Sequence, residues 1–236
     1  EKSRRGRRRS SSALLEALTS YGYDSDRLAN ATDGVSGENY GEIASKKCLE
    51  FLSQIDFNSE TDLKKAVLNV HHNLYDYGIQ DNKTKNMQAT LCAIAIDEND
   101  NLNTVNVGDS RMYRYRRGNI KQISRDQSLV QLLYEEGTIT ADEKKHHVHK
   151  NIIFPVMGNI SAEPKPDIKN LNEIMKYGDL ILICSDGLSD YVSCTEMEDI
   201  LDLPAKLPKR LERLVKLAID NGSQDNITII ALCCYD

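Results

Sequence analysis

The chain has 236 residues, of which 40% are hydrophobic and 28% are charged, as in ordinary globular proteins. This composition excludes a collagen-like or fully disordered chain, and the length suffices to bury a substantial core in one large domain or two small ones. The longest apolar stretches are strand-sized, so no membrane span is expected, and no charged-then-apolar start suggests a secretory signal.

The net charge of −6 is unevenly distributed. Residues 1–10 carry a local charge of +5, which leaves −11 on the rest of the chain. A domain this acidic is a poor general nucleic-acid binder. We interpret residues 1–12 as a solvated basic arm and residues 13–236 as one domain, and the first residue, Glu1, is compatible with a piece of a longer protein.

The six cysteines show no CxxC spacing, and most lie in apolar runs, where a free thiol behaves as a small hydrophobic group. This pattern argues against a zinc site and against a disulfide framework. It favours a reducing compartment, so we expect the protein in the cytoplasm.

The first half of the chain predicts a helix pair followed by hairpins. Residues 13–18 are compatible with a strand or a short helix. Helices are expected over 41–52 and 59–77, with Ser59 as the cap of the second. Strands are expected over 88–97, 102–107, 111–116 and 120–123.

The second half predicts more helices and two buried strands. Helices are expected over 128–136, 141–149, 196–201 and 208–220, and strands over 180–184 and 227–234. No repeat and no Pro/Gly/Ser-rich linker divides the chain. This order predicts a single α+β domain with layers around antiparallel sheets.

Four aspartates follow or precede strand-like runs, in short segments that also contain glycine: Asp33, Asp109, Asp186 and Asp225. Carboxylates at strand ends beside glycine suit Mg²⁺ or Mn²⁺, because glycine lets a backbone carbonyl approach the ion. Two such ions about 3.5–4 Å apart would turn a bridging water into a nucleophile at neutral pH. A single Asp-Gly is more often a turn than a metal ligand, so it is the joint occurrence that points to a metal centre.

Six segments occur in the order and spacing of the metal-dependent type 2C (PPM) protein serine/threonine phosphatases. They are 33–34 (DG), 87–91 (MQATL), 106–111 (NVGDSR), 125–130 (RDQSLV), 185–190 (SDGLSD) and 225–228 (DNIT). From residue 33 to the C-terminus the chain resembles the compact bacterial-type members most. The resemblance implies a four-layer α/β/β/α sandwich, two antiparallel sheets flanked by helix pairs, with metals in a cleft between sheet edges.

The resemblance also implies roles for individual residues. Asp33 would bridge two ions, the Gly34 carbonyl would bind one of them, and Asp186 and Asp225 would complete the ligands of the second. Asp109 with Asp186 would match the weaker third-metal site of some members. Residues 128–158 would form the flap beside the cleft, where members vary and substrates are thought to be sorted.

The N-terminal segment departs from the family pattern. Members usually open with Arg-x-x-Asn-Glu-Asp, in which the arginine grips the substrate phosphate. Alignment on Gly6 offers Arg9 for that arginine, but Ser12, Ala13 and Leu14 stand where the asparagine and the acids belong. The acids that could serve instead are Glu16, Asp24 and Asp26, and nothing in the sequence selects one.

Glu38 stands where the family has a histidine proposed to protonate the leaving alkoxide. A glutamate has an unperturbed pKa of about 4.3, and a nearby divalent cation would lower it further, so Glu38 would be ionised. We interpret it as a ligand to a metal-bound water or as a surface residue rather than as a replacement acid.

The leading hypothesis is hydrolysis of phosphoserine and phosphothreonine in proteins by a metal-bound hydroxide, with two Mg²⁺ or Mn²⁺ ions and a weaker third site like that of some family members. Catalytic roles fall to Arg9, Asp33, Asp186 and Asp225. The alternative is a pseudophosphatase, a binding or regulatory module with weak or no catalysis. We expect phosphoprotein substrates, a serine/threonine kinase as a partner, and a monomer that binds no nucleic acid.

Overall fold

The computed structural model describes residues 28–31, 34, 40–82 and 84–234. The basic arm expected over 1–12 and the element expected over 13–18 lie outside these residues, so the domain boundary stays a prediction. No helix in the described part of the chain is long and apolar enough to cross a membrane.

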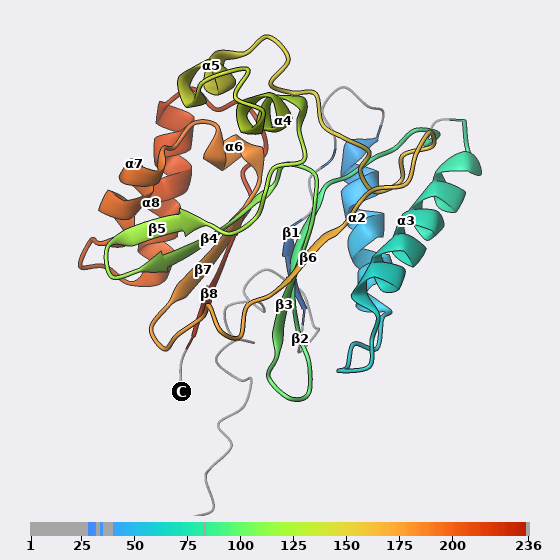
Figure 1. Cartoon of the computed structure of the whole chain (residues 1–236), viewed down its shortest axis with the longest axis horizontal. Coiled ribbons are helices and arrows are strands. Elements are labelled where there is room, and N and C mark those ends of the chain that lie inside the picture. The colour runs from blue at the N-terminus through green and yellow to red at the C-terminus, as the bar shows by residue number, and fades with distance from the viewer. Residues whose placement is uncertain (1–27, 32–33, 35–39, 83, 235–236) are drawn as a thin grey trace, which may run out of the picture.

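Two four-stranded antiparallel sheets form the centre of the molecule (Figure 1). The first sheet has the order β1-β2-β3-β6, built from β1 (Leu28–Ala31), β2 (Leu91–Ile96), β3 (Leu102–Val107) and β6 (Asp167–Asn170). The second has the order β5-β4-β7-β8, built from β5 (Asn119–Gln122), β4 (Arg111–Arg116), β7 (Leu180–Cys184) and β8 (Ile229–Cys233).

Alternation of side chains along the central strands explains why the sheets stack. In β7, Ile181 and Ile183 pack with Cys92 and Ile94 of β2 in a cluster between the two sheets. The intervening residues of β7, such as Leu182, face the opposite way and pack against helices. Because successive side chains on a strand point to opposite faces, a continuous apolar run is buried on both sides.

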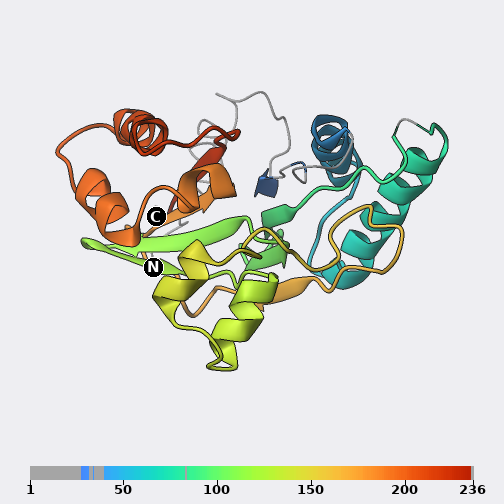
Figure 2. The ribbon, with the colours of Figure 1, turned by 90° about the horizontal axis from the view of Figure 1, so that it is seen from above.

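A helix pair covers the outer face of each sheet (Figures 1 and 2). On the first sheet lie α2 (Gly41–Ser53) and α3 (Leu63–Ile79), whose buried faces include Cys48 and Leu74. On the second lie α7 (Cys194–Leu201) and α8 (Leu207–Asp220), which bury Met197 and Leu214. The four-layer arrangement implied by the family resemblance is therefore confirmed.

The structure differs from the sequence prediction at several elements, among them β1, which was not expected, and the helix expected over 141–149, which ends at His146. Helix α3 begins after Asp62, whose side chain accepts from Lys65 N, whereas the predicted cap Ser59 hydrogen-bonds Glu98. Strand β6 was not expected because its four residues carry almost no apolar pattern; its pairing with β3 defines it. The single-turn helix α6 (Asp186–Ser189) was also not expected as a helix.

The segment expected as a flap, residues 128–158, contains α4 (Leu129–Glu135) and α5 (Ala141–His146). An isolated bridge from Ser128 to Ile153 closes the segment on itself, and a bridge from Met157 to Ala89 connects it to the rest of the molecule. Gly137 ends α4 in the left-handed region with a φ of 70°, which glycine adopts without strain. The two short helices project beside α6 at one end of the sheets (Figure 1).

Candidate active site

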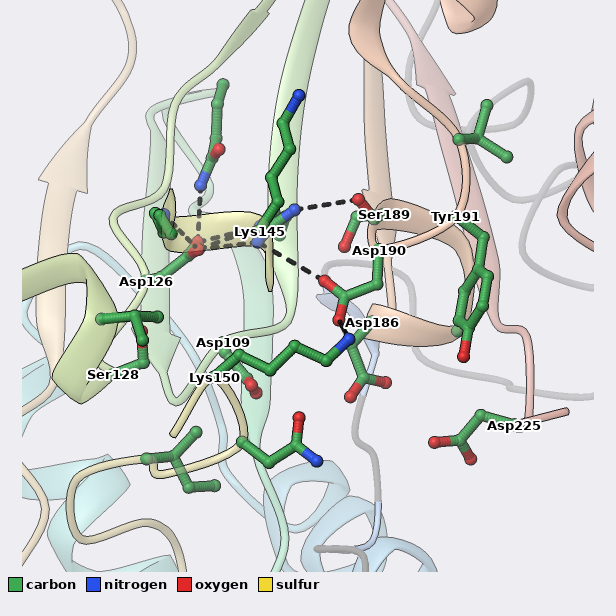
Figure 3. A pocket seen from close by; sticks show the side chains of 18 of the residues that line it. Asp109, Asp126, Ser128, Lys145, Lys150, Asp186, Ser189, Asp190, Tyr191 and Asp225 are labelled. Carbon is green, nitrogen blue, oxygen red and sulfur yellow. Dashed lines mark hydrogen bonds and ion pairs between the residues drawn. The ribbon is translucent and has the colours of Figure 1, made fainter. Parts of the chain in front are cut away.

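A pocket with a cavity volume of about 670 Å³ lies where the flap, α6 and the strand ends meet (Figure 3). Three connections contribute carboxylates to it. Asp109 comes from the turn between β3 and β4, Asp186 begins α6 directly after β7, and Asp225 precedes β8. Gly34, which forms an antiparallel bridge with Ala89, also lines this pocket.

Hydrogen bonds of the Ser185 hydroxyl and close packing at Gly187 bring the segments of Asp186 and Asp225 together. The Ser185 hydroxyl donates to the Asn226 carbonyl at 3.0 Å and accepts from Thr228 N at 3.0 Å. A Cβ on Gly187 would lie 2.4 Å from the Asn226 carbonyl oxygen, so only glycine permits this approach. The expected Asp-Gly pattern at 186–187 is therefore explained in part by packing, independently of any ligand.

The position of Asp109 depends on the residues on either side of it. Gly108 has a φ of 103°, which glycine adopts readily and other residues do not. On the other side, the Ser110 hydroxyl hydrogen-bonds the buried hydroxyl of Thr90 at 2.8 Å. The turn is held from both sides, so the Asp109 carboxyl is directed into the pocket (Figure 3).

The carboxyl groups of this site repel one another. Burial raises the pKa of Asp109 to about 7, and the negative charges of Asp186 and Asp126 add to the shift. A carboxyl that resists ionisation at neutral pH, beside a second carboxylate, would be stabilised by a cation placed between them. We call Asp109, Asp186 and Asp225 the acid cluster.

The acid cluster fits a hard divalent cation by the chemistry of its donors, which are all oxygen. Within the described residues, however, no group of three or more His, Cys, Asp or Glu side chains is close enough to hold an ion by itself. The ligand set expected from the sequence includes Asp33, which lies outside the described residues, and the Gly34 carbonyl beside it. A complete site therefore requires the segment that contains Asp33.

A second group of charges, which we call the charge network, lies next to the acid cluster and joins the flap to the sheet. Arg111 Nε and Nη2 donate to Asp126 at 2.9–3.1 Å, and Lys144 of α5 reaches the same carboxylate at 3.2 Å. Arg111 Nη2 also lies 3.7 Å from Asp190, which pairs with Lys150 at 3.3 Å (Figure 3). The network thus runs through Lys144, Asp126, Arg111, Asp190 and Lys150.

The charges of the network compensate one another where they are buried. Burial alone would raise the pKa of Asp126, but the charges of Arg111 and Lys144 and the hydrogen bonds from Arg111 and Gln122 outweigh it, so this pKa is lowered. Gln122 Nε2 donates to Asp126 at 2.7 Å. Asp126 is therefore an ionised structural anion, in contrast to Asp109.

Of the site residues expected from the sequence, Gly34, Asp109, Asp186 and Asp225 line one pocket. Arg9, Asp33 and Glu38 lie outside the described residues. Sequence reasoning did not find the charge network, although Arg111 and Asp126 both belong to segments that carried the family resemblance. Their pairing joins residues 15 positions apart, and nothing in the sequence indicates it.

Comparison with known proteins identifies the family. The family model described as "Protein phosphatase 2C" matches residues 16–226. The serine/threonine phosphatase stp of Listeria welshimeri is 30% identical over 216 residues, which cover 88% of this chain and 84% of that protein. The serine/threonine protein phosphatase PstP of Mycobacterium tuberculosis is 32% identical over 219 residues, 91% of this chain but 41% of that longer protein.

Solved structures agree in fold as well as in sequence. The crystal structure of the serine/threonine phosphatase Stp1 from Staphylococcus aureus has a TM-score of 0.78 and 32% identity, covering 89% of this chain and 84% of that one. The chain therefore belongs to the protein phosphatase 2C family, whose members matched here are protein serine/threonine phosphatases.

Proposed function

We propose that this protein phosphatase hydrolyses phosphoserine and phosphothreonine in proteins with the help of two Mg²⁺ or Mn²⁺ ions, and that a third ion binds more weakly. The observation that carries the proposal is the acid cluster, in which Asp109 and Asp186 line one pocket, and in which burial together with the charge of Asp186 raises the pKa of Asp109 to about 7. The structure of the PstP catalytic domain, 30% identical with a TM-score of 0.76, is a complex with two manganese ions.

In this proposal the ions supply an activated water and positive charge at the phosphoryl group when they are bound. Asp33, the Gly34 carbonyl, Asp186 and Asp225 hold the two principal ions, and Asp109 with Asp186 holds the third. Ser185 and Gly187 act indirectly, because their contacts with residues 226 and 228 keep the segments of Asp186 and Asp225 together.

The phosphate is oriented by a group other than Arg111. Arg111 uses Nε and Nη2 on Asp126, and Nη1 on the Ser189 carbonyl at 3.0 Å, so each of its nitrogens already has a protein partner. Freeing it for substrate would leave the buried carboxylate of Asp126 with Lys144 as its remaining cation among the described residues, which is costly. This supports Arg9 as the candidate for a bidentate contact with the phosphate.

The experiment is a metal titration followed by an activity assay. We expect calorimetry to detect Mn²⁺ binding at millimolar concentrations or below, and turnover of phosphoserine and phosphothreonine peptides that depends on the added metal. The surface variant Lys216→Gln, which changes an exposed ion pair with Asp220 on α8, serves as the control. Metal binding without turnover would leave the pseudophosphatase, a binding module on the same fold, as the function.

The proposal extends to the protein's setting. We propose a serine/threonine kinase as a partner, a monomeric state, and a location in the cytoplasm. The free thiols of Cys48, Cys92 and Cys184 are buried, and burial raises the pKa of Cys48 and Cys184 to about 12, so they are unreactive and suited to a reducing compartment. Sedimentation velocity at micromolar concentrations tests the monomer.

A further inference from the structure

One short segment of the flap supplies every lysine that lines the pocket within the described part of the chain. These lysines are Lys144, Lys145 and Lys150, on α5 and the turn that follows it. The chain as a whole carries a net charge of −6, so a basic wall beside the pocket is not a consequence of composition. The three lysines differ in how far their charges are already compensated.

Lys144 has a structural role. Its ammonium group contacts both Asp126 and Gln131, and only 21% of its side chain is exposed. Through Asp126 it connects α5 to Arg111 on β4. Lys144 is therefore a positioning residue that holds the flap, and its neighbours Lys145 and Lys150, at a defined place beside the pocket.

Lys150 and Lys145 are held less firmly. Lys150 reaches Asp190 at 3.3 Å, with 41% of its side chain and 31% of that of Asp190 exposed. Among the described residues, no carboxylate lies within ion-pair distance of Lys145, whose side chain is exposed. The charge network contains three cations and two anions, so its five side chains and Lys145 together carry two positive charges in excess.

We propose that Lys145 and Lys150 select phosphoproteins that carry a second anionic group, a carboxylate or another phosphate, near the residue to be dephosphorylated. This inference rests on the proposed function, because the acid cluster and its cations define where the first phosphate binds. The second anion then lies toward the flap, where Lys150 exchanges the exposed carboxylate of Asp190 for it and Lys145 gains its first anionic partner.

The test compares matched phosphopeptides at low ionic strength with Mn²⁺ present. One phosphothreonine peptide has alanine at the flanking positions, and others have glutamate, lysine or a second phosphothreonine there, on either side. We expect kcat/KM for the glutamate and doubly phosphorylated peptides to exceed that of the alanine peptide about 3- to 10-fold, as for exposed charge pairs at an interface. The preference weakens as salt screens the charges.

Variants assign the preference to particular residues. Lys145→Gln/Lys150→Gln reduces the ratio toward 1, and Lys145→Glu/Lys150→Glu reverses it in favour of the lysine-flanked peptide. Asp190→Asn removes the same ion pair as Lys150→Gln but keeps the cation, so the preference is retained. Lys216→Gln, which removes an exposed lysine from a Lys–Asp pair on α8, leaves the ratio at its starting value.

Binding of non-hydrolysable phosphonate peptides with the same flanks, measured by fluorescence anisotropy, separates this inference from the proposed function. Preferential binding of the peptides with anionic flanks, without turnover of the phosphopeptides, would contradict the proposed function and support the inference. Turnover with equal kcat/KM for all flanks, or a preference that survives the double glutamate variant, would overturn the inference and leave the proposed function standing.

Discussion

The acid cluster and the charge network lie side by side, and they shift the pKa of an aspartate in opposite directions. In the charge network, Arg111, Gln122 and Lys144 surround Asp126, and its pKa is lowered. In the acid cluster, burial and the charge of Asp186 raise the pKa of Asp109 to about 7. Both aspartates are close to Arg111, but only Asp126 receives its hydrogen bonds.

The direction of the pKa shift therefore distinguishes a carboxylate that stabilises the fold from one that is suited to bind a cation. A buried anion that is paired and hydrogen-bonded contributes to the fold, whereas neighbouring carboxylates that repel one another are stabilised by a cation placed between them. The comparison can be tested by removing one charge at a time from each region.

The largest expected effect follows from Asp186→Asn in the acid cluster. The amide keeps the size of the side chain but removes a charge needed to hold cations, so activity should fall at least about a hundredfold. Circular dichroism and thermal unfolding should show an intact fold. Normal turnover in this variant would mean that the assignment of metal ligands is wrong at its centre.

The matching change in the charge network is Asp126→Asn. It leaves Arg111 and Lys144 without their shared anion, and we expect the free energy of unfolding to fall by about 2–3 kcal/mol, since Asp190 and the Ser189 carbonyl still hold Arg111. Urea denaturation at pH 7 measures this loss. An unchanged midpoint would show that the network does not stabilise the fold.

The same variant has a defined pH dependence. Because the pKa of Asp126 is lower in the folded protein than in the unfolded chain, its stabilisation is present above the unfolded value of about 3.9. It is lost as the pH falls through the folded pKa. The difference in stability between wild type and Asp126→Asn should therefore be largest near neutrality and shrink below about pH 4.

Asp109→Asn should have the opposite and smaller effect on the metal-free protein. Removing a repelled carboxylate relieves charge repulsion within the acid cluster, so the unfolding temperature near pH 8 should rise by about 2–4 °C. Differential scanning fluorimetry with a chelator present measures it. A lower unfolding temperature for Asp109→Asn would instead show that Asp109, like Asp126, is an anion that stabilises the fold.

The smallest expected effect concerns Glu38, on the segment outside the described residues. An ionised glutamate cannot protonate a serine alkoxide, whereas p-nitrophenolate leaves without help. We expect aryl phosphates to be hydrolysed disproportionately well, and Glu38→His to narrow the gap to phosphoserine peptides several-fold. A ratio unchanged by the substitution would show that the proton comes from elsewhere.

Most of the fold could be predicted from the sequence where one signal dominated. The limits of β3, β4 and β7 agree with the predicted strands, because apolar or alternating runs bounded by turns define a strand locally. Strand β6 was missed for the opposite reason. Asp167–Asn170 has little apolar pattern, and its extended form is specified by hydrogen bonds to β3, about 65 residues away.

The candidate site divides in the same way. Four residues of the pocket could be predicted, because each belongs to a short segment with glycine or a strand end beside an aspartate. They are Gly34, Asp109, Asp186 and Asp225. The charge network and the lysines of the flap were not predicted, because the sequence position of a lysine, arginine or aspartate does not indicate which charged side chain it will contact.

The sequence by itself determined the family, the alternation that builds two sheets, and the acidic residues offered to a metal, since these are properties of short segments and their order. Only the tertiary structure decided which charges meet. Asp126 is buried and Asp109 is half-buried, and both lie near Arg111, yet the fold directs the guanidinium of Arg111 to Asp126 and the carboxylate of Asp186 to Asp109. Electrostatic energy depends on distances between side chains, and those distances are set by packing rather than by sequence separation.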